Sequence, residues 1–428
     1  MTTHDLSAHF ENGMRLIARR MTDADSVTAH VFVGTGARHE DLVHEYGVSH
    51  FLEHLLFRGS ERYPEAKQIY AAIDGVGGYH NAYTTHELTT FFIKVPKDSL
   101  TVALDVLADL VRRPLFDPTQ IDRERGVILE EMNVYRDDPA QHVFDYVGGL
   151  LWPQNGLRSD ILGTEDIIRS IPREAIHNYY TGTYTPDNVV ISVAGNIKID
   201  QLHALVEEKF GGWTGKLSRA RDRSESIVAP ERMHVFQRET NQAHIVFAAR
   251  GVPLRHQDEA AVKVMTAILG RGSSSRLYAR IREEQGLAYV VDMRAVGYTD
   301  TGEWTIYAGV RADKIEQVVE AVMQELRHIR EYAVDGDELK RTKQLLRGRV
   351  IMGQETNAAV ADRIGSELLL TGSVRTMDEM ITAIERVSIE DVQRVAQRYL
   401  DPSAVRLSMI AQVDDAMQRR IEQIISQS

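Results

Sequence analysis

Short apolar segments and longer amphipathic segments alternate along the chain. Four short segments rich in β-branched and aromatic residues predict strands, namely Ser26–Gly36, Leu88–Pro96, Ala243–Val252 and Gly302–Val310. The segments between them repeat apolar residues at helical spacing. Strands that pair in meanders, with helices over one face, fit this alternation better than a doubly wound parallel sheet, so we expect an α+β fold.

The order of these elements repeats in the two halves of the chain. Ile168–Ile197 predicts a capped helix, a turn and an apolar strand, and Ile384–Val413 predicts the same order 216 positions later. A capped amphipathic helix recurs in the same way at Val95–Pro114 and Val310–Ile329. We therefore expect two duplicated domains, each a mostly antiparallel sheet covered on one face by helices.

A polar, charged stretch around residues 214–231 has neither helical nor strand periodicity and predicts a linker. The first domain then spans residues 1–213 and the second spans residues 232–428. A length of 428 residues agrees with two cores of about 200 residues each.

Composition excludes several classes of function. The net charge of −12, without a dense Lys/Arg stripe, argues against a nucleic-acid partner. The absence of cysteine excludes disulfides and thiolate metal sites, so a metal would need His, Asp or Glu. No stretch approaches the roughly 18 apolar residues of a membrane span, and the amino terminus lacks a secretory pattern. We expect no membrane association and a cytoplasmic location.

The clearest candidate chemistry lies in a predicted helix at about residues 44–57. His50 and His54 are four positions apart and share one face, with Glu53 beside them. Two imidazoles suit zinc, and a neighbouring carboxylate that does not bind the metal can accept a proton from zinc-bound water. This H-x-x-E-H order is the inverzincin motif. The alternative is a core helix whose histidines bond to nearby carbonyl groups, although three buried polar groups would then each need a partner.

A third ligand has candidates on a helix predicted from Asp122. Glu124 and Glu131 are seven residues apart and share a face, whereas Glu130 points elsewhere. One of the pair can bind zinc while the other accepts a hydrogen bond from a ligating histidine. A solvated acidic helix face is the alternative.

These motifs resemble the M16 metallopeptidases, which include insulin-degrading enzyme, pitrilysin and the mitochondrial processing peptidase. That family has H-x-x-E-H, then 76 residues, then Glu, and here residues 55–130 separate His54 from Glu131. The flanks "LLFRGS", "NAYTTHELT" and "ERGVILEEM" are also similar. The resemblance implies one zinc ion per chain on His50, His54 and Glu131, with Glu53 as the catalytic base and Glu124 as the acid behind a ligand.

The resemblance also implies how substrate binds. "SSRLYARIREEQGLAYVV" matches a family region whose Arg and Tyr reach the substrate, which assigns Arg282 and Tyr289. The segment "NAYT", comprising Asn81, Ala82, Tyr83 and Thr84, predicts an edge strand, and in the family this edge binds peptide as an added strand.

The second half has no H-x-x-E-H in its corresponding helix, Asp258–Gly270, so we expect it to be non-catalytic. In the family the zinc motif and the Arg/Tyr pair meet across a chamber made of two half-shells. One chain carries both motifs, which predicts a homodimer in which Arg282 and Tyr289 complete the active site of the partner. The sequence thus predicts a zinc endopeptidase for short or unfolded peptides, with a non-catalytic peptide-binding or scaffold protein as the alternative.

Overall fold

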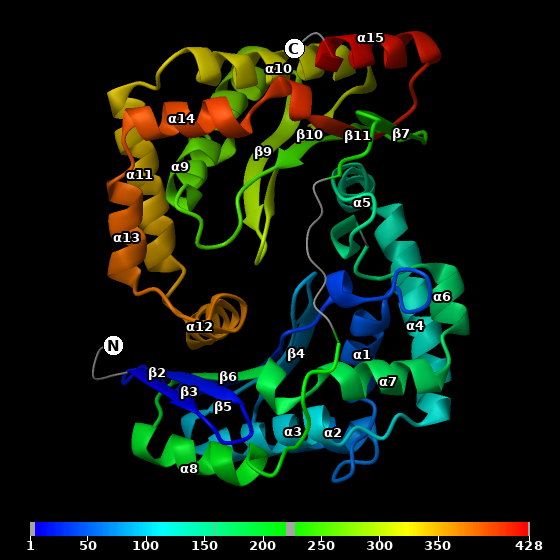
Figure 1. The fold of residues 1–428 in the computed structure, drawn as a ribbon, viewed down its shortest axis with the longest axis vertical. Coiled ribbons are helices and arrows are strands. Elements are labelled where there is room, and N and C mark those ends of the chain that lie inside the picture. The colour runs from blue at the N-terminus through cyan, green and yellow to red at the C-terminus, as the bar shows by residue number, and fades with distance from the viewer. Residues whose placement is uncertain (1–4, 159, 220–226, 427–428) are drawn as a thin grey trace. The chain divides into compact units, whose positions relative to one another are not determined.

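A computed structural model describes residues 5–158, 160–219 and 227–426 (Figure 1). Part of the predicted linker, residues 220–226, lies outside the described residues. The strands are β1 (Asp5–His9), β2 (Arg15–Arg20), β3 (Ser26–Val33), β4 (Tyr79–Thr84), β5 (Thr89–Pro96), β6 (Val189–Gly195), β7 (Met233–Gln237), β8 (Ala243–Arg250), β9 (Ala288–Gly297), β10 (Gly302–Val310) and β11 (Arg406–Ala411).

Helices follow the strands in both halves. They are α1 (Val48–Leu56), α2 (Ala66–Asp74), α3 (Leu100–Arg112), α4 (Pro118–Asp137), α5 (Pro139–Leu151), α6 (Glu165–Ser170), α7 (Arg173–Thr183), α8 (Ile199–Phe210), α9 (Glu259–Gly270), the π-helical turn η5 (Tyr278–Glu284), α10 (Ile315–Glu331), α11 (Gly336–Met352), α12 (Asn357–Thr371), α13 (Met377–Glu385), α14 (Ile389–Tyr399) and α15 (Asp415–Ser426).

The two sheets have the same topology. The first has the order β1-β2-β6-β3-β5-β4 and the second has β7-β11-β8-β10-β9. In chain order β2 to β6 correspond to β7 to β11, and the two sheet orders then coincide apart from the extra strand β1. The pairing agrees as well, since β2 with β6 and β7 with β11 are parallel and the remaining corresponding pairs are antiparallel. The predicted α+β fold with two duplicated, mostly antiparallel sheets is confirmed.

The helices repeat in the same order. Between the corresponding strands, α1 corresponds to α9, α3 to α10, α4 to α11, and α5 to α12. The series continues with α6 and α13, α7 and α14, and α8 and α15. The short helix α2 has η5 in its place. The internal repeat inferred from the sequence therefore extends over the helices as well as the strands.

One corresponding pair of helices is exchanged between the sheets. Helix α12, from the second half of the sequence, packs on β2, β6 and β3 of the first sheet, whereas α5, from the first half, packs on β8, β11 and β7 of the second (Figure 1). Gly365 of α12 allows the close approach, because a Cβ there would lie 2.3 Å from the ring of Phe32. The exchange covers a second face of each sheet.

Strand β8 shows how both faces of a sheet become buried. Successive side chains of a strand point to opposite faces. Phe247 packs in the cluster that includes α9 and α10, while Val246 and Ala248 pack with Val143 and Val147 of α5. A strand buried on both faces does not alternate between apolar and polar residues, and β8 likewise lacks such alternation.

Because of this exchange, the compact units are not contiguous halves of the chain. The first comprises residues 1–133, 159–222 and 352–374, and the second comprises residues 134–158, 223–351 and 375–428. The division predicted from the sequence, 1–213 and 232–428, places α5 and α12 in the opposite units. A linker can be inferred from local polarity, but the sheet on which a helix packs depends on long-range contacts. Among the described residues, no helix combines the length and apolar character needed to cross a membrane.

Candidate metal centre

Helix α1 carries the H-x-x-E-H motif, and its apolar residues fix which face is buried. Val48, Phe51, Leu52, Leu55 and Leu56 recur at helical spacing and are all buried. The motif residues occupy the remaining face. The helix predicted at residues 44–57 is confirmed, although it begins at Val48.

The start of α1 is held by the carboxyl group of Glu40, seven residues before Gly47. Gly47 has φ of 93° and caps the helix, and a Cβ at this position would lie 2.5 Å from a backbone oxygen. The two carboxylate oxygens of Glu40 accept hydrogen bonds from the backbone N–H groups of Gly47 and Ser49, both at 2.7 Å. Side-chain oxygens that accept from the first N–H groups of a helix cap it. Burial raises the pKa of Glu40 to about 8, and the two hydrogen bonds oppose this rise. Glu40 thus fixes the position of the helix that carries both histidines.

Helix α4 brings the acidic residues to α1. Glu124 is buried, whereas the side chain of Glu131 is 45% exposed. Both lie against His54, as expected from their spacing of two helical turns. Glu130 is exposed and does not belong to the group.

Three side chains converge in an arrangement that could hold a metal ion. Ligand atoms of His50, His54 and Glu131 all lie within 4.8 Å of one another. Oε2 of Glu131 lies 3.7 Å from Nε2 of His50 and 3.4 Å from Nε2 of His54. Ligands of a tetrahedral zinc, with bonds of about 2.0–2.1 Å, lie about 3.3 Å apart. These three residues fit zinc in type and spacing, and they leave a fourth position for water or substrate.

Burial and the neighbouring charged groups shift the pKa values of His50 and His54 in opposite directions. Burial, with the nearby His54, lowers the pKa of His50 to about 4, so His50 is neutral at pH 7 and able to bind a metal. Burial by itself would lower the pKa of His54, but hydrogen bonds that its ring donates to Glu124 and Glu131 raise it to about 9. The carboxylates around His54 thus favour a positive charge at this place, which a divalent cation can supply.

Glu124 contacts the nitrogen of His54 that faces away from the metal group, and Arg58 contacts Glu124. Oε2 of Glu124 lies 3.3 Å from Nδ1 of His54, and its Oε1 lies 2.8 Å from Nε of Arg58. A carboxylate on the second nitrogen of a ligating histidine orients the ring and raises its basicity. Arg58 was missed in the sequence. It lies in the turn that follows α1, four residues after His54, and this spacing is the signal that could have found it.

Glu53 lies between the metal group and strand β4. Oγ1 of Thr84 donates a hydrogen bond of 2.6 Å to Oε2 of Glu53. Burial raises the pKa of Glu53, and this bond opposes the rise. A half-buried carboxylate with a raised pKa beside a metal group is suited to accepting and releasing a proton.

Strand β4 lies at the edge of the first sheet, as predicted for residues 81–84. The side chain of Asn81 accepts a hydrogen bond of 2.9 Å from the backbone N–H of Ala82. The hydroxyl of Tyr83 donates to Asp362 of α12. The exchanged helix α12 is therefore attached to this edge strand, a contact that no local sequence pattern indicated.

The Arg/Tyr pair lies together in the second unit. The guanidinium carbon of Arg282 lies 5.1 Å from the ring centre of Tyr289 and 4.9 Å from that of Tyr278. The side chain of Tyr289 is 69% exposed, at the start of β9. A half-buried Arg and an exposed phenol held side by side can donate hydrogen bonds to a ligand.

Comparison with known proteins gives the family. Residues 15–165 match the family described as "Insulinase (Peptidase family M16)", and residues 170–346 match "Peptidase M16 inactive domain". The chain belongs to peptidase family M16. Among curated M16 relatives, an uncharacterized zinc protease of Bacillus subtilis, YmxG, is 34% identical over 91% of this chain and 94% of its own length. An uncharacterized zinc protease of Streptomyces coelicolor is 32% identical over 97% of this chain and 91% of its own length.

Solved structures show the same M16 fold at low sequence identity. A protease from Helicobacter pylori covers 95% of this chain and 99% of its own, with a TM-score of 0.88 and 18% identity. A Pseudomonas fluorescens structure described as a peptidase M16 inactive domain has a TM-score of 0.87 and 17% identity, covering 96% of this chain and 98% of its own. These likenesses support the fold, and the resemblance to the short, two-domain M16 type is confirmed.

Proposed function

We propose that this M16 chain is a zinc-dependent endopeptidase that hydrolyses short or unfolded peptides. The relatives named zinc proteases support a metallopeptidase. The observation that carries the proposal is the convergence of His50, His54 and Glu131 within 4.8 Å, with Glu53 on the same helix. One zinc ion per chain would be held by these three side chains.

Zinc, when bound there, supplies Lewis acidity and lowers the pKa of a coordinated water toward about 7. Glu53 accepts the proton of the attacking water and passes it to the leaving amine. Thr84 holds the carboxylate of Glu53 through its hydroxyl. Glu124 keeps the ring of His54 oriented, and Arg58 compensates the charge of Glu124.

Substrate binds along β4 as an added antiparallel or parallel strand. The N–H of Ala82 at this edge donates to the side chain of the preceding Asn81, which a peptide carbonyl can replace. Backbone pairing through residues 81–84 accepts varied side chains. This supports action on unfolded or short peptides, since a folded protein has few free strands to offer.

Arg282 and Tyr289 act on the substrate from a second copy of the chain. Donors of this kind stabilise the oxyanion that forms on attack. The exposure of Tyr289 and its contact with Arg282 support a role toward a ligand. The functional enzyme is then a homodimer that encloses the peptide in a chamber.

Replacement of the base tests the chemistry. Glu53→Gln should retain zinc and bind peptide, while hydrolysis of quenched-fluorescence peptides falls by roughly 10²–10⁴-fold. Glu130→Gln, an exposed neighbour outside the metal group, serves as the control and should leave activity unchanged. Wild-type activity in Glu53→Gln would contradict the proposed mechanism. If the wild type shows no cleavage that a chelator stops, a peptide-binding or scaffold protein would be favoured. The match to a family described as an inactive domain makes this outcome worth testing.

Mixing two inactive variants tests the shared site. Glu53→Gln and Arg282→Ala should each be inactive alone. In a mixed dimer, one site combines the native Glu53 of one chain with the native Arg282 of the other, so activity should return. No recovery on mixing would place Arg282 in the site of its own chain, and full activity of Arg282→Ala alone would place it outside the reaction.

A further inference from the structure

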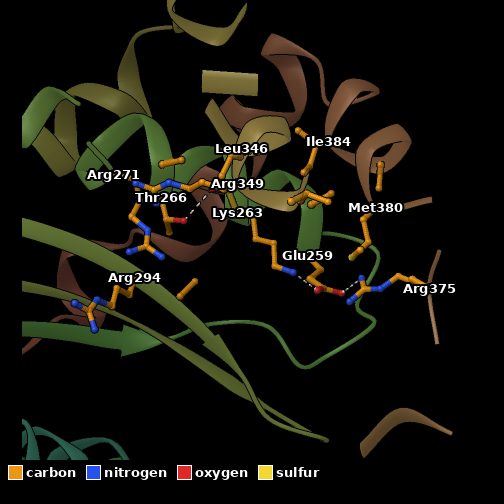
Figure 2. Close-up of a pocket in the computed structure, with 15 residues that line it drawn as sticks. Glu259, Lys263, Thr266, Arg271, Arg294, Leu346, Arg349, Arg375, Met380 and Ile384 are labelled. Carbon is orange, nitrogen blue, oxygen red and sulfur yellow. Dashed lines mark hydrogen bonds and ion pairs between the residues drawn. The ribbon is translucent and has the colours of Figure 1, made fainter. Parts of the chain in front are cut away.

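A cavity of about 330 Å³ lies within the second unit and is lined chiefly by α9, β9, α11 and α13 (Figure 2). These elements correspond in the duplicated topology to α1, β4, α4 and α6. Of the first-unit counterparts, α1 and α4 carry the metal group and the proposed base, and β4 carries Thr84, which donates to that base. The second unit thus retains an open site built from the same elements that form the metal centre in the first.

The charge of the two sites is opposite. The metal centre is acidic, whereas the cavity is lined by five cationic side chains and a single carboxylate. The lining cations are Lys263, Arg271, Arg294, Arg349 and Arg375, and the carboxylate is Glu259. No His pair or second acid is present among the lining residues to hold a metal. The excess of positive charge in this lining favours an anionic ligand.

At one end of the cavity, a single carboxylate pairs with two cations. The carboxylate of Glu259 lies 2.6 Å from Nζ of Lys263 and 2.9 Å from Arg375. Burial by itself would raise the pKa of Glu259, but these two cations lower it to about 2. This triad is a fixed ion-pair network, drawn with dashed lines in Figure 2.

The other end has an excess of positive charge. Arg271 and Arg294 share one carboxylate, Asp292, at 3.8 and 2.7 Å. The guanidinium of Arg349 makes no hydrogen bond or ion pair with the described residues. Figure 2 shows Arg271 and Arg294 on one side of the cavity and the triad on the other. Guanidinium groups gathered in this way suit the planar oxygens of phosphate or carboxylate.

The wall between the two ends is apolar. It is formed by Leu346 and Val350 of α11 together with Met380, Ala383 and Ile384, which belong to α13. A cavity of this size, with an apolar wall and a few convergent charged groups, is typical of small-molecule sites. Inorganic phosphate alone would leave most of this wall in contact with water.

We propose that the second unit binds a small organic anion, with its phosphate or carboxylate at Arg271, Arg294 and Arg349 and its apolar body against α11 and α13. This site lies within one unit and does not depend on peptidase activity. Its test is a binding measurement, so its failure and the failure of the proposed function are distinguishable.

Calorimetric titration of the intact chain with three probes tests the site. Adenosine 5′-monophosphate and octanoate distinguish an organic phosphate from a carboxylate, and inorganic phosphate tests the anion without an apolar body. At least one of the organic probes should bind with a Kd below about 1 mM, more tightly than inorganic phosphate, and affinity should fall as salt is added.

Two variants and a matched control locate the binding. Arg271→Gln and Arg349→Gln should each raise the Kd by about tenfold, because each removes a charge-assisted contact. Arg341→Gln removes the same charge from an exposed position of α11 outside the cavity and should change the Kd less than about twofold. The proposal is wrong if neither organic probe binds the wild type, or if Arg341→Gln weakens binding as much as Arg349→Gln does.

Discussion

The hydroxyl of Thr84 donates a hydrogen bond of 2.6 Å to the carboxylate of Glu53, joining the edge strand to the motif helix. The sequence placed Thr84 among the residues that bind substrate through the strand. The side-chain contact adds a second role, which is to hold the carboxylate of the proposed base. The two roles have different kinetic consequences.

Thr84→Val keeps the shape of the side chain and removes the donor. We expect kcat to fall by about tenfold with little change in KM, because the carboxylate of Glu53 loses a charge-assisted bond while the backbone of β4 is unaltered. Thr84→Ser should retain most of the activity. A raised KM with unchanged kcat would instead assign Thr84 to strand pairing alone.

Glu124 should control zinc affinity rather than the chemical step. Glu124→Gln removes the negative charge beside Nδ1 of His54 and leaves Arg58 without its ion-pair partner. We expect zinc affinity to fall by roughly 10–100-fold, measured by competition with a chelator. Activity should recover when excess zinc is added. Loss of activity that zinc does not restore would give Glu124 a different role.

Glu40 should contribute to the stability of the first unit. Its two oxygens accept from the N–H groups of Gly47 and Ser49, and burial raises the pKa of Glu40 to about 8. Glu40→Ala removes both accepting oxygens, so it should reduce the free energy of unfolding by about 1–3 kcal/mol in urea titrations at about pH 5, where Glu40 is uncharged in the folded chain. The exposed Glu11→Gln removes a carboxylate elsewhere and should leave the urea midpoint unchanged. Equal effects of the two substitutions would contradict the capping role.

His30 should make the first unit sensitive to acid. Its ring is stacked on Phe32 and Phe92 at 5.1 and 4.7 Å between centres, and burial lowers its pKa from 6.5 to about 3. The unfolded chain therefore binds a proton at this residue below pH 6.5, whereas the folded chain does not until about pH 3. Stability is present in full above pH 6.5 and is lost as the pH falls toward 3, by about 2 kcal/mol at pH 5.

His30→Phe retains the ring and removes the titration. Between pH 7.5 and 5 the wild type should lose about 2 kcal/mol more unfolding free energy than the variant. Urea titrations of the metal-free protein check this difference, since zinc release at low pH then cannot contribute. Parallel pH profiles for the two proteins would show that His30 is not the group responsible.

Local sequence patterns were sufficient to predict the helices that carry the metal group and the residues that share one face of each helix. The apolar spacing from Val48 to Leu56 predicted α1, and it left His50, Glu53 and His54 on one face. On α4, the spacing of seven residues put Glu124 and Glu131 on one face but did not choose between them as ligand. The family resemblance made that choice, and the distances to Glu131 agree with it.

By itself the sequence determined the order of strands and helices, their duplication and the residue types of the metal group, because periodicity and motif spacing are properties of neighbouring positions. Tertiary structure alone decided that α5 and α12 exchange sheets, and that Asp362 of α12 holds Tyr83 of the edge strand. It also brought Arg271, Arg294 and Arg349 to one cavity. The physical reason is that these contacts join residues far apart in the chain, and burial of apolar surface, rather than local propensity, selects which elements meet.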